Sequence, residues 1–221
     1  TEEIAKKSFK KYKIRGQVIT NKERKGTNFN YNFGVSKAKT ELVLTTDADV
    51  IFEKNSIKEA LKVLLNDSKI GAVTGELIPK LQNKSIASNT EVPYRNVYGK
   101  MCSWESKIDS SYCFNGPFIL LKRSTFIKIP EKSGASDASA ALNIIKNGFK
   151  TIYVSEVKFS ELIAKNITSQ RKQKVRRATR LLEATWNNKN LMFNGTKFGN
   201  IIFPLRFLLL FISPLTLFIG G

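Results

Sequence analysis

The chain has 221 residues, with 37 Lys or Arg against 18 Asp or Glu and a formal net charge of +19. This length suits one ordinary domain with a real core and a short appendage. The chain contains no His and only two Cys, so a His-based catalytic triad and a structural zinc site are excluded. Catalysis would therefore use carboxylates, Lys, Tyr or a bound metal, and the two isolated Cys are expected to be small core residues.

The first third of the chain alternates amphipathic helices with short apolar strands. We expect a surface helix at the start, strands over 17–20, 42–46 and 70–74, and a helix beginning at Glu53 or Asn55. That second helix has apolar residues at helical spacing from Ile57 to Leu65. Residues 21–32 are polar, basic and rich in turn formers, and residues 33–39 lead into the second strand. This order predicts a β-loop-α-β unit over residues 42–74.

The alternation resumes after a stretch of poor periodicity. Residues 75–112 predict irregular structure, with one helix around 94–107. After them we expect a strand over 118–121, a helix that follows Asp137 and ends near Asn147-Gly148, and a strand over 151–154. Strands that alternate with helices predict an α/β fold with a mixed, mainly parallel sheet flanked by helices.

Residues 173–186 predict an amphipathic helix with two very different faces. Its polar face is a stripe of guanidinium groups from Arg176, Arg177 and Arg180. A solvated basic face is one explanation, because charged stripes usually face water. Contact with phosphate is the other, because Arg in preference to Lys favours bidentate binding.

The chain ends in an apolar run over residues 201–219, which Arg206 and two prolines interrupt. About 20 apolar residues suffice to cross a bilayer, so a membrane span, a tilted interfacial helix and a buried core helix are all compatible with this run. Between Lys158 and Arg206 there are eleven Lys or Arg against two acidic residues. Basic residues beside an apolar segment predict a location at the cytoplasmic face of a membrane.

Two carboxylates, Asp47 and Asp49, follow the strand predicted over 42–46. Carboxylates at i and i+2 where a strand ends present hard oxygens to Mg²⁺ or Mn²⁺, ions that keep positions open for substrate phosphates. A strand-end turn is the alternative, because Asp is also a common turn former. The metal interpretation indicates nucleotide-sugar chemistry.

Four features in chain order resemble the inverting, membrane-associated glycosyltransferases of family 2, a group that includes cellulose, chitin and hyaluronan synthases. They are Lys25-Gly26 with Asn32-x-Gly34, Thr46-Asp47-Ala48-Asp49, Ser136-Asp137 ahead of an amphipathic helix, and Gln173-Lys174-Val175-Arg176-Arg177. The sequence departs from the family pattern in three places. Lys25 and Gly26 are transposed, Ser136 stands where the family has an acidic residue, and Arg177 stands where it has Trp.

The resemblance implies a GT-A fold, which is Rossmann-like, with its first β-α-β portion upstream of Thr1. It divides the chain into a catalytic domain over 1–160, a basic interface-helix region over 161–199 and a membrane-associated segment over 200–221. The last of these would lie at the membrane or be the start of a transmembrane segment.

The resemblance also implies a role for each matching residue. Asp137 would be the catalytic base, with a helix N-cap as its alternative role, and Asp47 and Asp49 would hold Mn²⁺ or Mg²⁺. The residues implied to bind the donor diphosphate are Gln173, Arg176, Arg177 and Lys25. Those implied for the acceptor region are Trp104, Glu105, Asn115 and Gly116.

The predicted function is inverting transfer of a sugar from a UDP- or GDP-sugar to a lipid-linked or polysaccharide acceptor at the cytoplasmic membrane face. The alternative is a degenerate, non-catalytic module that binds close to the membrane, which the Ser136 and Arg177 departures motivate. No nucleic-acid partner is expected, because no nucleic-acid-binding motif accompanies the positive charge.

Overall fold

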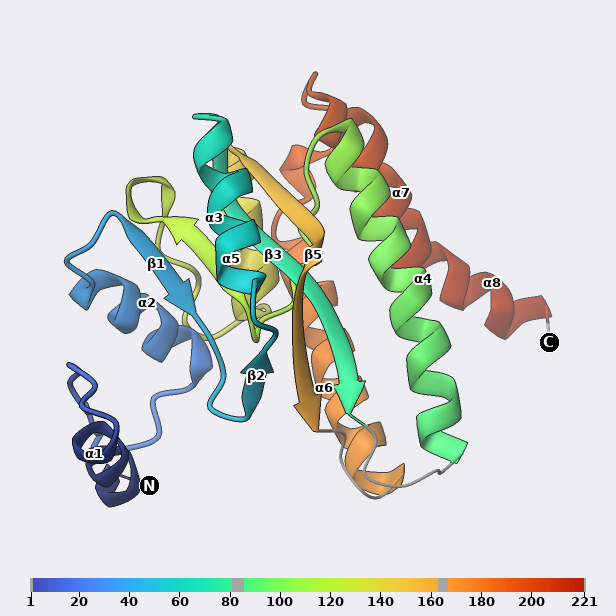
Figure 1. The fold of residues 1–221 in the computed structure, drawn as a ribbon. Coiled ribbons are helices and arrows are strands. Elements are labelled where there is room, and N and C mark those ends of the chain that lie inside the picture. Colours follow the sequence, from blue (N-terminus) through green and yellow to red (C-terminus); the bar gives the residue numbers. More distant parts are fainter. Residues whose placement is uncertain (1, 81–85, 163–166, 221) are drawn as a thin grey trace.

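The computed structural model describes residues 2–80, 86–162 and 167–220. In this part of the chain five strands form one mixed sheet, in the order β1-β4-β3-β5-β2 (Figure 1). The strands are β1 (Leu42–Thr45), β2 (Val50–Phe52), β3 (Ile70–Lys80), β4 (Ile119–Lys122) and β5 (Lys150–Leu162). The expectation of an α/β fold with a mixed sheet is confirmed.

The directions of the strands differ in part from the prediction. β3 and β5 pair in parallel, whereas β1 with β4, β3 with β4 and β2 with β5 pair antiparallel. As expected, β1, β3 and β5 run in the same direction. Among the described strands, however, most neighbouring pairs are antiparallel. The reason is that β4 inserts between β1 and β3, which a β-loop-α-β pattern in the sequence cannot reveal.

β3 and β5 are longer than the strands predicted at their positions. They are paired from Ile70 to Lys80, so the prediction of irregular structure is wrong for residues 75–80. The register shifts between Ile70 and Ala72 and again between Gly75 and Glu76. A Cβ on Gly75 would collide with Val157, and glycine therefore permits the close approach of the two strands at this shift.

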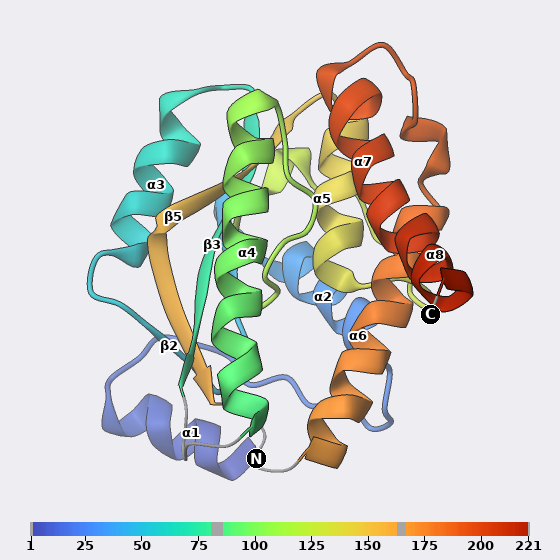
Figure 2. The same ribbon diagram turned by 90° about the vertical axis from the view of Figure 1, so that its right-hand side faces the viewer.

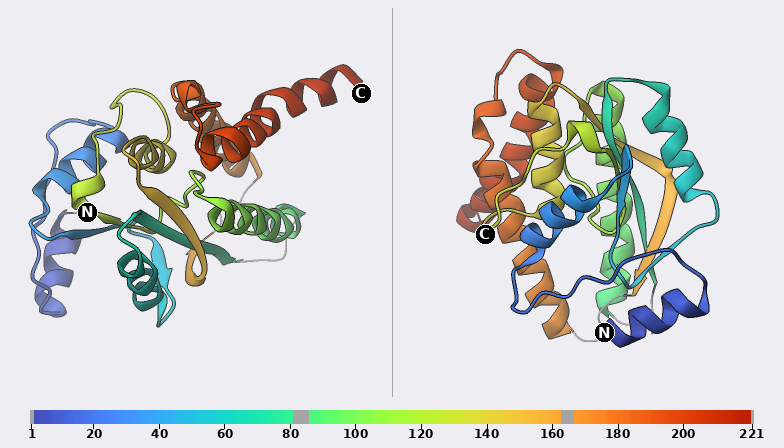
Figure 3. Two further views of the ribbon diagram at one scale, coloured as in Figure 1. Left: turned by 90° about the horizontal axis from the view of Figure 1, so that it is seen from above. Right: turned by 90° about the vertical axis from the view of Figure 1, so that its left-hand side faces the viewer.

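Helices cover both faces of the sheet (Figures 2 and 3). They are α1 (Glu2–Lys11), α2 (Thr27–Lys37), α3 (Ser56–Asn66), α4 (Ile86–Ile108), α5 (Ser136–Lys146) and α6 (Ile167–Trp186), with short 3-10 turns at Arg123–Thr125 and Lys189–Leu191. α3 packs on one face through the fully buried Ala60 and Leu64. On the other face, Cys102 of α4, Leu142 of α5 and Ala184 of α6 belong to one buried cluster. The helices predicted at α1, α3, α4, α5 and α6 are confirmed.

The C-terminal segment forms one helix with two π-helical turns, which we call the terminal helix. Its parts are η3 (Phe198–Ile202), α7 (Phe203–Phe207), η4 (Leu208–Ile212) and α8 (Ser213–Gly220). Phe198, Ile202 and Phe203 are buried against the domain. The stretch Phe198–Thr216 is long and apolar enough to cross a membrane, by length and composition alone.

The predicted domain boundaries stay predictions. The boundary at residue 160 falls within β5, and the one at 199 falls within the terminal helix. Residues 163–166, which belong to the predicted interface region, lie outside the described part of the chain.

The strand predicted over residues 17–20 is absent. This segment has no regular secondary structure, and Ile19 is 48% exposed. None of the strand pairings among the described residues includes this segment. A tetrapeptide without a strand partner cannot form a stable strand.

Helix α2 replaces the turns predicted before residue 32. Its buried side chains are Asn28, Asn32 and Val35, so its buried face carries no apolar stripe that would predict a helix. The Asn32 amide exchanges two hydrogen bonds of 2.9 Å with the backbone of Ile129, one as donor and one as acceptor. Buried amides thus attach α2 to the segment that precedes α5.

Candidate active site

An open cavity of about 1670 Å³ lies between the sheet, α4, α5, α6 and the terminal helix. Eight of the eleven site residues predicted from the sequence line it: Lys25, Asp47, Asn115, Gly116, Asp137, Gln173, Arg176 and Arg177. These residues come from positions up to about 150 residues apart in the chain, so the fold brings them together. The other three, Asp49, Trp104 and Glu105, are not among the residues that line it.

Asp47 and Asp49 lie where the chain turns from β1 into β2. Burial raises the pKa of Asp47 above its usual value, and the charge of Asp49 raises it further, while the Arg177 guanidinium opposes the rise. A carboxylate whose charge is disfavoured by a neighbouring carboxylate is a suitable site for a cation. Among the described residues no group of three or more His, Cys, Asp or Glu could hold a metal ion. Substrate phosphates and water would therefore have to complete the coordination of a bound Mg²⁺ or Mn²⁺.

Asp137 lies in the first turn of α5 and is held by backbone amides. Its Oδ1 accepts a hydrogen bond of 2.8 Å from the Ala138 amide. Burial raises the pKa of Asp137, while the amides of Ala138 and Gly116 and the charge of Arg177 oppose part of the rise. The alternative role of N-cap does not apply, because the cap position of α5 is Ala135.

The arginine stripe of α6 faces the cavity. Gln173, Arg176, Arg177 and Arg180 all line it, and their side chains remain accessible to solvent within it. Arg177 donates from Nη2 to Glu161 Oε1 of β5 at 3.2 Å. Because Arg177 acts electrostatically on both Asp47 and Asp137, this guanidinium links the two carboxylates across the cavity.

The loop between α4 and β4, residues 109–118, forms another wall. Residues 110–115 of this loop are buried, and Asn115 donates from Nδ2 to the Gly75 carbonyl at 2.7 Å. Gly116 lies against the base candidate, since a Cβ added to it would be 3.2 Å from Asp137 Oδ2. A buried loop needs partners for its backbone, and the neighbouring strands and helices supply them.

An ionic cluster that the sequence did not predict joins α4, α6 and this loop. Glu91 forms ion pairs with Arg95 at 3.0 Å and with Lys174 at 2.9 Å. Although burial raises the pKa of Glu91, Lys174 and Arg95 hold it below its usual value. Arg95 also donates from Nη1 to Asn115 Oδ1 at 3.3 Å. The i, i+4 spacing of Glu91 and Arg95 was the available signal, but the predicted helix began only at residue 94.

Contrary to the prediction, neither Trp104 nor Glu105 lines the cavity. Trp104 is 47% exposed on α4. Glu105 is 2% exposed and lies beneath the loop, where it accepts a hydrogen bond from the Ser111 hydroxyl at 2.6 Å. The terminal helix contributes Leu209, Leu210 and Pro214 to the cavity instead.

Residues 1–129 match the family model "Glycosyl transferase family 2". The chain therefore belongs to this family of glycosyltransferases. Over 109 residues it is 26% identical to "Poly-beta-1,6-N-acetyl-D-glucosamine synthase" of Staphylococcus aureus, strains COL and MSSA476 among them. That alignment covers 48% of this chain and 26% of the relative, so the chain spans about a quarter of the length of the curated relatives that it matches.

Two solved structures of other proteins align with this chain and show its fold. The mannosyltransferase PcManGT from Pyrobaculum calidifontis, in complex with GDP-Man and Mn²⁺, aligns with a TM-score of 0.75 at 22% identity, over 93% of this chain and 55% of that chain. GalNAc-T7 with UDP, GalNAc and Mn²⁺ aligns with a TM-score of 0.55 at 13% identity, over 73% of this chain and 34% of that chain. The chain thus has a GT-A fold, as the sequence motifs imply.

Proposed function

We propose that this chain is the catalytic part of an inverting, metal-dependent glycosyltransferase that transfers a sugar from a UDP- or GDP-sugar to an acceptor hydroxyl. The observation that carries the proposal is that one cavity is lined by Asp47, Asp137 and the arginine stripe of α6. A cation site, a candidate base and anion-binding groups are the parts that sugar transfer from a nucleoside diphosphate requires.

The donor diphosphate binds between α6 and the loop before β2. Arg176 and Arg177 donate to phosphate oxygens, and Gln173 and Lys25 complete the polar wall. Asp47 and Asp49 would hold Mn²⁺ or Mg²⁺, which supplies a positive charge that stabilises the leaving diphosphate. The named complexes of the two structural neighbours, with GDP-Man or UDP and with Mn²⁺, support this choice of donor and ion.

Asp137 accepts the proton of the acceptor hydroxyl as the hydroxyl oxygen attacks the anomeric carbon. The new C–O bond forms on one face while the bond to the diphosphate breaks on the other, with its electron pair leaving on the nucleotide. One displacement inverts the anomeric configuration. A positioned base of this kind contributes on the order of 10² to 10⁴-fold to the rate.

The acceptor is a lipid-linked saccharide or a polysaccharide, and the reaction takes place at the cytoplasmic face of a membrane. The polymer named for the Staphylococcus aureus relatives supports a polysaccharide product. The apolar stretch Phe198–Thr216 and the preceding basic region support the membrane location. Asn115 and Gly116 form the part of the acceptor side nearest to Asp137.

The proposal is tested by incubating the whole protein in membranes with a panel of UDP- and GDP-sugars and Mn²⁺ or Mg²⁺. We expect transfer from one donor, inversion of the anomeric configuration by NMR, and loss of turnover in Asp137→Asn and after chelation. If Asp137→Asn retained turnover, Asp137 would not be the catalytic base. No turnover from any donor, with endogenous acceptors present, would favour the degenerate binding module.

A further inference from the structure

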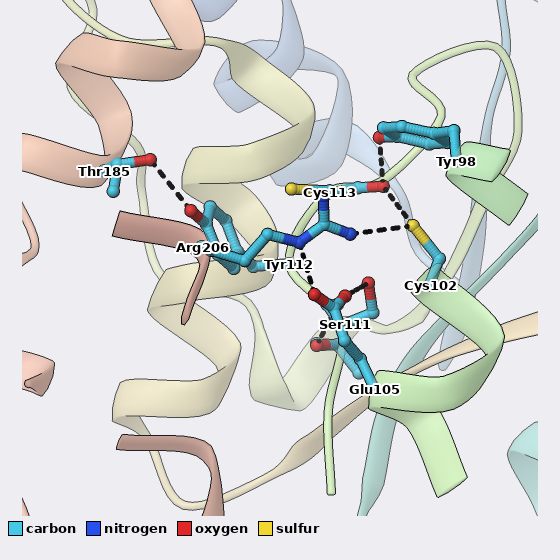
Figure 4. Close-up of polar contacts among 9 residues, drawn as sticks. Tyr98, Cys102, Glu105, Ser111, Tyr112, Cys113, Thr185 and Arg206 are labelled. Carbon is cyan, nitrogen blue, oxygen red and sulfur yellow. Dashed lines mark hydrogen bonds and ion pairs between the residues drawn. The ribbon is translucent and has the colours of Figure 1, made fainter. Parts of the chain in front are cut away.

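A charged residue is buried in the middle of the otherwise apolar terminal helix. Arg206 of α7 is 6% exposed, although the stretch around it is apolar enough to enter a membrane. Its Nε forms an ion pair with Glu105 Oε1 of α4, and its Nη2 lies 3.4 Å from Cys102 Sγ. The guanidinium also lies over the ring of Tyr98, 5.8 Å from the centroid (Figure 4). The terminal helix is thereby attached to α4 through a buried polar cluster.

Stability alone does not account for this cluster. Taking two charges out of water costs about as much as their attraction returns, so a buried ion pair contributes little net stability. The terminal helix has other contacts, since Phe198, Ile202 and Phe203 are buried. In addition, Phe207 and Phe211 both lie against the ring of Trp186 in α6. Apolar burial is sufficient to dock the helix.

Two of the three partners of Arg206, Glu105 and Tyr98, hold the α4–β4 loop through hydrogen bonds from or to their oxygen atoms. Glu105 accepts from the Ser111 hydroxyl at 2.6 Å with the carboxylate oxygen that Arg206 does not use. The Tyr98 hydroxyl donates to the Cys113 carbonyl at 2.6 Å. Figure 4 shows that these two contacts lie on either side of the guanidinium. Arg206 therefore contacts Glu105 and Tyr98, two of the side chains that bind the loop at Ser111 and Cys113.

The loop continues from Cys113 into the cavity. Asn115 and Gly116 line it, and the Gly116 amide contacts the Asp137 carboxylate. Tyr98 and Cys113 line the same cavity. A displacement of the loop at Cys113 would thus move the wall next to Asp137.

We propose that Arg206 is a positioning residue: from the terminal helix it holds Glu105 and Tyr98, and through them the α4–β4 loop on the acceptor side of Asp137. The inference rests on the proposed function for the identity of the acceptor side. The cavity is complete only when the terminal helix is docked, so the segment that meets the membrane also shapes the acceptor site.

The first variant removes both charges and keeps an acceptor for Ser111. In Glu105→Gln with Arg206→Met, the amide oxygen replaces the carboxylate, and the apolar side chain stays in an apolar site. The second variant, Tyr98→Phe, keeps the ring beneath the guanidinium and removes only the bond to Cys113. A matched control is Glu59→Gln with Lys62→Met on α3, which changes an ion pair on the opposite face of the sheet.

Two measurements are made on the whole protein in membranes. Amide hydrogen exchange over residues 111–118 is expected to be at least about tenfold faster in both test variants, with exchange in α5 unchanged. The KM for the acceptor is expected to rise about tenfold, with the KM for the donor unchanged. The control pair is expected to match the unmodified protein in both.

Three outcomes would overturn the inference. Unchanged exchange in Tyr98→Phe and in the double variant would show that Arg206 does not hold the loop. Faster exchange with an unchanged acceptor KM would show that the loop does not position the acceptor, and equal rises in both KM values would indicate a general structural role. If the double variant fails to fold, Tyr98→Phe tests the step through which Arg206 is proposed to act, and unchanged exchange over residues 111–118 in this variant would overturn the inference. Exchange needs no turnover, so failure of this inference is distinguishable from failure of the proposed function.

Discussion

Arg177 of α6 pairs with Glu161 of β5 at 3.2 Å while its charge also acts on Asp47 and Asp137. The side chain of Arg177 is 49% exposed, so its ion pair is accessible to an anion that enters the cavity. A diphosphate offers a guanidinium stronger, bidentate partners than one surface carboxylate does. Under the proposed function, Arg177 would exchange Glu161 for the diphosphate of the donor.

Arg177→Gln is expected to raise the donor KM about 10- to 100-fold, because hydrogen bonds to charged groups are worth roughly 1.5–3 kcal/mol. The free energy of unfolding should change by less than about 1 kcal/mol, since the pair with Glu161 is partly exposed. Initial rates and urea unfolding measure the two effects. Arg171→Gln, on the same helix but outside the cavity lining, is the control and should have the donor KM of the unmodified protein.

Glu161→Gln is expected to lower the donor KM by about two- to fivefold, because Arg177 no longer has to leave a carboxylate to bind phosphate. Binding of the free nucleoside diphosphate by titration calorimetry measures the same competition without turnover. A higher KM would mean that Glu161 orients Arg177 rather than competing for it.

Asp47→Asn is expected to raise the Mn²⁺ concentration for half-maximal activity at least about tenfold, because one carboxylate of the pair is lost. Binding of Mn²⁺ in the presence of nucleoside diphosphate, followed by electron paramagnetic resonance, should weaken in parallel. Asp67→Asn, at the C-terminal end of α3, is the matched control. Equal Mn²⁺ binding in both variants would exclude Asp47 as a ligand.

The dependence on pH follows from the burial of Asp137, which raises its pKa. Since the ionised form is the base, kcat/KM should fall on the acid side at a pH above the usual pKa of Asp. Because its pKa is raised, Asp137 binds its proton more tightly in the folded protein than in the unfolded protein. The stabilisation of the folded state that comes from this tighter binding is lost as the pH rises through the folded pKa. Asp137→Asn should therefore gain stability relative to the unmodified protein at neutral pH, and not below the unfolded pKa. Thermal unfolding at several pH values checks the sign.

Gly116→Ala is expected to lower kcat about 10- to 100-fold, because the added Cβ would lie 3.2 Å from Asp137 Oδ2 and displace the base. Gly34→Ala in α2 is the control, since a Cβ there has no heavy atom within 4 Å. In a helix this second change should be neutral or stabilising by up to about 1 kcal/mol. Steady-state rates and unfolding curves of the two variants separate the site from the fold.

Local patterns in the sequence were sufficient to predict much of this molecule. The apolar residues before Asp47 predicted β1, and the helical spacing after Asp137 predicted α5, because burial of one face imposes a short-range period. The arginines of α6 were correctly assigned to one face. The order of these motifs was enough to predict the family and the GT-A fold that the comparisons support.

Other features were decided only by contacts between distant residues. α2 is stabilised by Asn28 and Asn32, whose amides find carbonyl partners about a hundred residues away, so its buried face has no apolar period. The insertion of β4 between β1 and β3 likewise depends on pairing across the chain. A local pattern carries no information about such partners.

The sequence by itself determined the family, the alternation of helices and strands and eight of the residues that line the cavity. Tertiary structure alone decided that the stripe of α6 faces this cavity, that Glu105 lies beneath the loop and that Arg206 is buried against it. The physical reason is that a buried charge in an apolar helix needs an ionic partner. For Arg206 the fold supplies Glu105, which is 101 residues away in the chain.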